Sequence, residues 1–133
     1  MRKFLFISLC ALALLGCKKN DSRQPSAPIV VTGGYSELTS THVKISASFN
    51  PLYYMEVEEY GVIISPTRPD LDINSYWSHH YVYDKNVVPE YTCEFNDLQP
   101  GTTYYYRAYM RYDYLVSYKT DYGEVKTFTT LAQ

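Results

Sequence analysis

Residues 98–111 read LQPGTTYYYRAYMR, a turn that leads directly into an alternating run of residues. Pro100-Gly101 marks the turn, because glycine and proline together interrupt regular structure. From Tyr104 onward two sets of residues alternate: Tyr104, Tyr106, Ala108 and Met110 on one side, and Tyr105, Arg107, Tyr109 and Arg111 on the other. A period of two indicates a strand with one buried face and one outward face. We expect the first set to point into a core and the second set to point away from it.

The same pattern recurs in six further short segments that turn residues separate. In chain order they are residues 29–32, 43–49, 60–64, 76–83, 91–95 and 123–130. Gly33-Gly34 interrupts the first segment, which predicts a bulge or a kink. No stretch of ten or more residues after the N-terminal segment shows helical spacing. Seven short strands predict an all-β fold, a seven-stranded antiparallel sandwich of two sheets.

Three motifs carry a family resemblance. Leu98-x-Pro100-Gly101-Thr102-x-Tyr104 resembles the turn into one strand of fibronectin type III domains. In that family the tyrosine, here Tyr104, forms a structural corner whose hydroxyl group bonds to the backbone just upstream. Segments 60–65 and 122–130, together with residues 105–109 that continue from the first motif, resemble a bacterial branch of the family, which is common in envelope lipoproteins of gut-type Gram-negative bacteria. The resemblance covers residues 28–131 and implies an immunoglobulin-like sandwich.

This resemblance implies no particular function, because the fold hosts adhesion, spacing and ligand binding alike. The chain also departs from the family in two loops. Residues 51–59 are aromatic and acidic, and the connection before the last strand lacks the glycine or asparagine usually found there.

The N-terminal segment predicts a secretory signal. Arg2 and Lys3 precede an apolar run over residues 4–15, which is too short to span a bilayer. The run ends in Leu14-Leu15-Gly16-Cys17, which resembles the lipobox of bacterial lipoproteins, where the cysteine is acylated and the preceding peptide is removed. We therefore expect a signal peptide over residues 1–16, a lipidated tether over 17–27 and a domain over 28–133. The alternative is an ordinary signal peptide followed by an incidental cysteine.

The expected lipid sets the expected location and partners. Acyl chains at Cys17 would hold the protein on a membrane of the cell envelope. Lys18 follows the cysteine where some lipoproteins retained at the inner membrane carry aspartate, which favours the outer membrane. The face of the membrane, periplasmic or external, stays open. A net charge of -2 argues against a nucleic-acid partner, which needs a basic surface.

Candidate nucleophiles and metal ligands are few. Cys93 is the only cysteine that would remain for chemistry in the lipidated protein, and its place in an alternating strand predicts a small buried hydrophobe. Asp70-x-Asp72-x-Asn74 opens like a calcium loop but lacks the later glycine and glutamate, so a polar strand connection is the better interpretation. His79-His80, adjacent in a strand, would point to opposite faces.

Carboxylates form the last candidate catalytic set. Glu56, Glu58 and Glu59 could act as acid and base, or they could simply be solvated on a loop rim. The sequence contains no zinc, phosphate-loop or nucleophile motif. We therefore expect no catalysis, no cofactor and no metal.

Tyrosine is unusually frequent in this sequence, with 16 residues in 133, and its distribution indicates candidate binding surfaces. In a sandwich of this type the loop after the second strand and the loop before the last strand share one end. A binding tip there would contain Tyr53, Tyr54, Tyr114 and Tyr118, because amphipathic rings suit protein and glycan contacts. The alternative is an extended hairpin whose tyrosines pair across strands and cover the neighbouring loop as core.

A second candidate surface is the outward face of the strand that follows the turn. Tyr105, Arg107 and Tyr109 lie there, and a guanidinium group could stack on a ring. Two functions follow from these surfaces. The first is recognition of a partner protein or a glycan at the envelope, and the second is a structural or assembly accessory role within an envelope complex.

Overall fold

The computed structural model describes residues 29–50, 56–74, 79–82 and 87–133. Its regular structure in these ranges is entirely β. Across the described chain, no helix has the length and apolarity needed to cross a membrane. Eight strands follow one another: β1 (Ile29–Ser36), β2 (Val43–Asn50), β3 (Glu56–Ser65), β4 (His79–Val82), β5 (Glu90–Phe95), β6 (Thr103–Tyr114), β7 (Ser117–Tyr122) and β8 (Lys126–Thr129).

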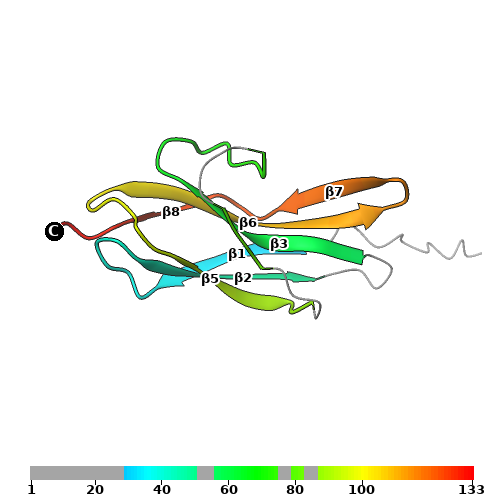
Figure 1. Cartoon of the computed structure of the whole chain (residues 1–133), viewed down its shortest axis with the longest axis horizontal. Coiled ribbons are helices and arrows are strands. Elements are labelled where there is room, and N and C mark those ends of the chain that lie inside the picture. Colours follow the sequence, from blue (N-terminus) through cyan, green and yellow to red (C-terminus); the bar gives the residue numbers. More distant parts are fainter. Residues whose placement is uncertain (1–28, 51–55, 75–78, 83–86) are drawn as a thin grey trace, which may run out of the picture.

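The strands form two antiparallel sheets that pack face to face (Figure 1). One sheet has the order β1-β2-β5, and the other has the order β4-β3-β6-β7, with β8 also paired to β6. β6 is 12 residues long and pairs with β3 on one side and with β7 and β8 on the other. The prediction of an all-β antiparallel sandwich is confirmed.

The strand expected over residues 123–130 contains only β8, and β7 precedes it as a strand that was not expected. β7 pairs with β6 up to Tyr122, and β8 resumes the pairing at Lys126. Between them the N–H of Gly123 donates to the carbonyl of Ala108 at 2.9 Å. The N–H of Ala108, however, donates to Oγ1 of Thr32 in β1 at 3.0 Å. β7 and β8 therefore occupy one strand position, and a side chain from the other sheet completes the pairing at the break.

Two glycines allow the close approaches that β1 makes. A Cβ atom on Gly123 would lie 2.3 Å from Oγ1 of Thr32, and one on Gly33 would lie 2.4 Å from the carbonyl oxygen of Ser46. The pairing register of β1 against β2 shifts between Thr32 and Tyr35. This shift confirms the bulge predicted at Gly33-Gly34.

The core lies between the sheets. It is lined by the residues that point inward from each strand, which are mostly every second residue. The buried members from β2, β3 and β6 are Val43, Ile45, Ala47, Phe49, Tyr60, Val62, Ile64, Tyr104, Tyr106, Ala108 and Met110. These are the inward faces expected from the alternation. Cys93 is also fully buried, and burial raises the pKa of its thiol to about 12. The interpretation of Cys93 as a core hydrophobe is confirmed.

Tyr104 forms the expected corner at the start of β6. Its hydroxyl group accepts a hydrogen bond from the N–H of Gln99 at 2.9 Å. Its ring stacks on Phe128 with centroids 5.4 Å apart and an interplanar angle of 16°. Gly101 in the preceding turn has a φ of 57°, a left-handed conformation that favours glycine. The turn and the corner together fix which residues of β6 face the core.

Candidate functional site

The β6–β7 hairpin is the element that stands out from the sandwich. Figure 1 shows it extending past the end of the three-stranded sheet. Its turn is Leu115-Val116, between Tyr114 and Ser117, which pair as the last residues of the two strands. The side chains of the turn are almost entirely in solvent, with Leu115 88% and Val116 100% exposed. The hairpin thus presents an apolar tip at one end of the domain.

The inner face of the hairpin continues the core. Tyr112 is buried, and its hydroxyl group donates to the carboxylate of Asp121 at 2.9 Å. Tyr114 is half-buried against the cluster that contains Phe49 and Tyr112. The ammonium group of Lys119 lies 3.9 Å from the centroid of the Tyr114 ring. These contacts support the alternative in which part of the hairpin's tyrosine content is structural.

The outer face of the hairpin carries two stacked pairs of arginine and tyrosine. The guanidinium carbon of Arg107 lies 3.9 Å from the ring centroid of Tyr122, and that of Arg111 lies 4.7 Å from the ring centroid of Tyr118. Each pair joins β6 to β7, so two strands hold each stack in place. We call these four residues the Arg–Tyr face. Stacking of guanidinium on tyrosine was expected here, but the rings come from β7 and not from β6.

Tyr109 corrects one expectation, because its side chain is fully buried. It points away from the main core, as the alternation predicts, but it packs there with Ile63 and Leu71 in a second small cluster. The connection that holds Leu71 folds over the outer side of the sheet (Figure 1). The Tyr109 hydroxyl group donates to the carboxylate of Glu59, and burial followed by this hydrogen bond raises the pKa of Tyr109. Tyr109 is therefore a structural residue.

The two neighbours of Tyr109 on that face differ in their accessibility. Tyr105 is half-buried against the same cluster. Arg107 is half-exposed, and its Nε is buried without a hydrogen-bond partner among the described residues. Burial lowers the pKa of Arg107, while Tyr122, Asp72 and Asp70 act in the opposite direction. Of the expected binding face of Tyr105, Arg107 and Tyr109, Arg107 remains accessible and Tyr109 does not.

The four tyrosines of the expected tip do not form one described surface. Tyr53 and Tyr54 lie outside the described residues. Tyr114 is on the inner face of the hairpin, and Tyr118, 56% exposed, is on the outer face. β3 begins beside the hairpin, because Glu56 pairs with Asp113. The first residue of β3 and the hairpin therefore lie at the same end of the domain.

Tyr122 is the residue of this face that the sequence interpretation missed. The motif at 122–130 placed it at the start of the last strand, with no partner. Its pairing opposite Tyr109 follows only once Leu115-Val116 is recognised as a tight turn. Counting outward from that turn would have placed Tyr118 and Tyr122 on the same face as Arg111 and Arg107, and this was the available signal.

The other chemical candidates have structural partners. The guanidinium of Arg68 lies 3.0 Å from the carboxylate of Asp70 and lowers its pKa. The carboxylate of Asp72 accepts the N–H of Asn74 at 2.7 Å, which supports a polar connection. Within the described ranges, no group of three or more histidine, cysteine, aspartate or glutamate residues could hold a metal ion. Among the three glutamates, Glu56 and Glu58 are exposed and Glu59 is bonded to Tyr109.

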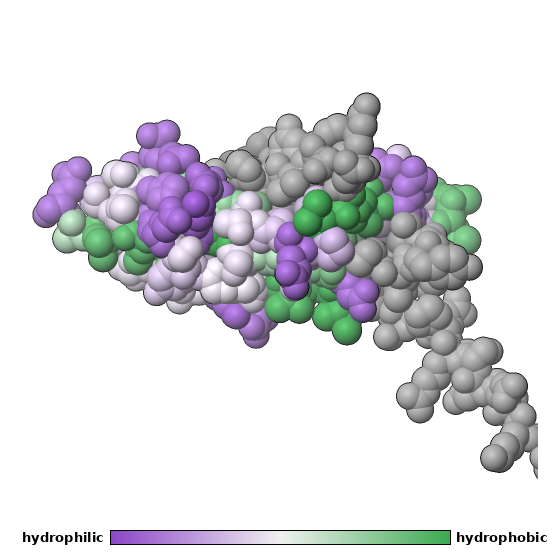
Figure 2. Space-filling model, turned by 90° about the horizontal axis from the view of Figure 1, so that it is seen from below, coloured by the Kyte–Doolittle hydropathy of each residue, from purple (hydrophilic) through white to green (hydrophobic). Residues whose placement is uncertain are grey.

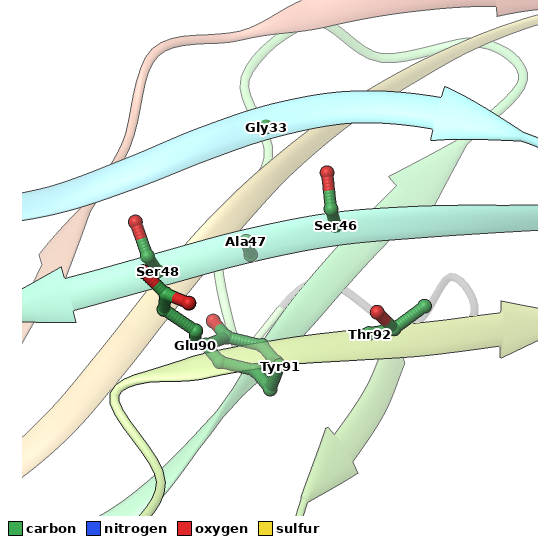
Figure 3. Close-up of a pocket in the computed structure, with 7 residues that line it drawn as sticks. All are labelled: Gly33, Ser46, Ala47, Ser48, Glu90, Tyr91 and Thr92. Carbon is green, nitrogen blue, oxygen red and sulfur yellow. The ribbon is translucent and has the colours of Figure 1, made fainter.

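A shallow depression of about 370 Å³ lies over the three-stranded sheet (Figure 3). It is lined by Gly33, Ser46, Ala47, Ser48, Glu90, Tyr91 and Thr92. The hydroxyl group of Tyr91 donates to the carbonyl of Gly61 in the facing sheet, and its ring packs on Phe49 and Tyr60. The depression therefore offers small polar groups and no ring free for stacking, which makes it a weaker candidate than the hairpin.

Known structures share this architecture. The sensor domain of the anti-sigma factor RsgI4 from Pseudobacteroides cellulosolvens superposes with a TM-score of 0.59 at 17% identity, over 81% of this chain and 98% of that one. The sixth fibronectin type III domain of human fibronectin type III domain containing protein 3 superposes with a TM-score of 0.55 at 19% identity, over 82% of this chain and 91% of that one. The domain has the fibronectin type III fold. No protein-family model and no curated protein matches the sequence.

Within this fibronectin type III fold, the turn of the hairpin lies at the end opposite the tyrosine corner (Figure 1). Identities below 20% carry the fold and not the function. The function therefore has to be argued from the residues of the hairpin itself.

Proposed function

We propose that the protein is a non-catalytic recognition module that binds a partner protein or glycan through its Arg–Tyr face. Acyl chains on Cys17 hold this module at the cell envelope. The observation that carries this proposal is the stack of Arg111 on the half-exposed Tyr118. Tyrosine and arginine supply much of the binding energy in known interfaces. Here both are positioned before any partner arrives.

The charge of the Arg–Tyr face indicates the chemistry of the partner. Neither Arg107 nor Arg111 forms an ion pair with a described residue. A guanidinium group has five donors in a planar fork that matches carboxylates and phosphates. Stacking on a ring leaves the edge of that fork available, while the ring limits the side-chain entropy lost on binding. The face therefore suits acidic groups, such as the carboxylates of a protein or of an acidic glycan.

The proposal can be tested with the lipidated full chain. We expect binding to acidic members of a glycan array, or co-purification with one protein from solubilised membranes. Arg111→Ala and Tyr118→Ser should each weaken that binding at least tenfold. Tyr35→Ser is the matched control, because Tyr35 is 46% exposed but lies on the other sheet. Equal losses from Tyr118→Ser and Tyr35→Ser would contradict the assignment to the Arg–Tyr face.

The same experiment distinguishes the accessory role. A partner that is released by mild salt, and whose binding depends on Arg111, indicates recognition. A complex of fixed stoichiometry that survives salt and both substitutions would indicate an assembly subunit instead.

The anchor is tested separately by Cys17→Ser. The variant should incorporate no labelled palmitate and should accumulate as the unprocessed precursor, because acylation of this thiol precedes cleavage in proteins with a lipobox. Palmitate labelling of the variant would contradict the lipid anchor and leave the Arg–Tyr face untouched.

A further inference from the structure

The turn of the β6–β7 hairpin is apolar where most hairpin turns are polar. Among the large hydrophobic residues of the described ranges, Leu115 and Val116 are the most exposed, at 88% and 100%. Figure 2 shows hydrophobic surface at the end of the molecule where this hairpin turns. Two adjacent aliphatic side chains fully in water are unfavourable unless something covers them in use.

The backbone at Leu115 adds a second, independent observation. Its φ is 61°, in the left-handed region where glycine and asparagine are ordinarily found. Leucine is strained in this conformation and makes no buried contact there that would compensate. The leucine therefore does not contribute to the stability of the turn, which points to a role for its exposed side chain.

The position of the turn identifies what it can reach. β1 begins at Ile29, at the same end of the domain as this turn (Figure 1). The 12 residues from Cys17 to Pro28 precede β1, and an extended segment of that length spans at most roughly 40 Å. If Cys17 is acylated, the tether joins the domain at the end that carries the turn and keeps this end within roughly 40 Å of the lipid surface.

We propose that Leu115 and Val116 insert into the bilayer interface and give the domain a second membrane contact. The inference rests on the proposed lipid anchor at Cys17. Tyr114, the last residue of β6 before the turn, has a ring of the amphipathic kind that favours the headgroup region. The Arg–Tyr face lies on the side of the hairpin and not at its tip, so it stays accessible to a partner in this orientation.

The charges around the turn indicate how the contact responds to salt. Arg111 and Lys119 are balanced by Asp113 and Asp121 within the five residue pairs of the hairpin that run from Met110–Asp121 to Tyr114–Ser117. These five pairs therefore carry no net charge, and the exposed Glu56 beside Asp113 adds none that would attract anionic lipids. The insertion is apolar, and it neither requires anionic lipids nor weakens at high salt.

The test uses the lipidated full chain reconstituted into vesicles of phosphatidylcholine. Val116→Cys introduces a thiol at the tip for a polarity-sensitive fluorophore, and Leu131→Cys does so near the C-terminus, where Leu131 is 54% exposed. The buried Cys93 does not compete for the label. We expect the label at position 116 to shift to the blue and to be quenched by spin-labelled lipid, at both low and high salt. The label at 131 should do neither.

A second variant separates insertion from folding. Leu115→Gly relieves the left-handed strain and removes the side chain, so the domain should unfold at an equal or higher denaturant concentration. In a chain without residues 1–17, which lacks both the acyl chains and the apolar signal segment, Leu115→Gly should lower partitioning into the same vesicles roughly tenfold to a hundredfold. Leu131→Ser should leave partitioning unchanged.

Each other outcome overturns the inference. If the chains float with the vesicles but the label at position 116 keeps the fluorescence it has in water, the anchor is present and the second membrane contact is not. Chains that do not float lose the anchor and the inference with it. A blue shift that grows with protein density and resists lipid quenching would show that a second copy of the chain covers the tip.

Discussion

The hydroxyl oxygen of Thr32 accepts the N–H of Ala108 at 3.0 Å, and this bond joins the first strand of one sheet to the central strand of the other. Thr32 is fully buried. Its hydroxyl group supplies the acceptor that a carbonyl of the last strand would otherwise supply, because that strand is interrupted at this point.

Thr32→Val tests the importance of this bond. Valine has nearly the same shape but cannot accept a hydrogen bond, so the N–H of Ala108 would be buried without a partner. We expect a loss of about 1–3 kcal/mol in the free energy of unfolding, measured by urea denaturation. Thr92→Val is the control, because Thr92 is exposed on β5 and should change stability by a few tenths of a kcal/mol at most. Similar losses in both variants would mean that Thr32 is not used in this way.

Gly123→Ala tests the close approach on the other side of the same contact. The new methyl group would lie 2.3 Å from Oγ1 and 2.7 Å from the backbone nitrogen of Thr32. Overpacking of this kind should destabilise the domain by roughly 1–3 kcal/mol, visible as a lower thermal midpoint. Gly34→Ala meets no atom within 4 Å and should be neutral or slightly stabilising. A neutral Gly123→Ala would contradict the packing described for β1.

Tyr104→Phe removes the corner hydroxyl group and keeps the ring. The N–H of Gln99 then loses its partner, and we expect a cost of about 1–3 kcal/mol by chemical denaturation. Tyr105→Phe, one residue further along, should cost only about a few tenths of a kcal/mol. Equal denaturation midpoints for the two variants would argue against the corner.

Alkaline pH should destabilise the domain through its buried acids. Because the pKa of Cys93 is raised to about 12, the folded state holds this proton more tightly than the unfolded chain does. The contribution is complete below the ordinary thiol pKa of roughly 8.5 and is lost as pH rises toward 12. Burial also raises the pKa of Tyr91 and Tyr109, so their contributions decline above roughly pH 10.

Urea unfolding at pH 7.5 and pH 10.5 measures this effect. The midpoint should be lower at pH 10.5, and the thiol should lower the free energy of unfolding by at most about 1.4 kcal/mol per pH unit. Cys93→Ala should be less stable than the original chain at pH 7.5 but should lose less on going to pH 10.5. Parallel losses in the two chains would show that the thiol does not contribute.

The sequence predicted the fold wherever alternation coincides with burial on one face. The inward residues of β2 and the Tyr104 set of β6 read directly as strands, because one face is core and the other is not. Tyr109 was misjudged because the outer face of β6 is covered by a distant connection that contains Leu71. A period of two reports which residues share a face, but it cannot report what covers that face.

The division of the last strand was equally inaccessible from the sequence. The N–H of Ala108 has no acceptor on the interrupted strand. It donates instead to Thr32, which lies 76 positions away in the chain and in the other sheet. The hairpin was recognised as an alternative, but its turn was obscured, since leucine and valine occupy positions where glycine or asparagine is the usual signal. The sequence pattern therefore does not place a turn at Leu115 and Val116.

The interrupted last strand also bears on how copies of this domain behave when they are crowded. A long straight edge strand is a template on which a neighbouring chain can add its own strand, and aggregation follows. This edge consists of pieces of six and four residues with a break between them, and the β1 edge of the other sheet is bent by its bulge. Neither of these two edges offers a continuous ladder, so a neighbouring domain cannot extend either sheet by a full strand at them.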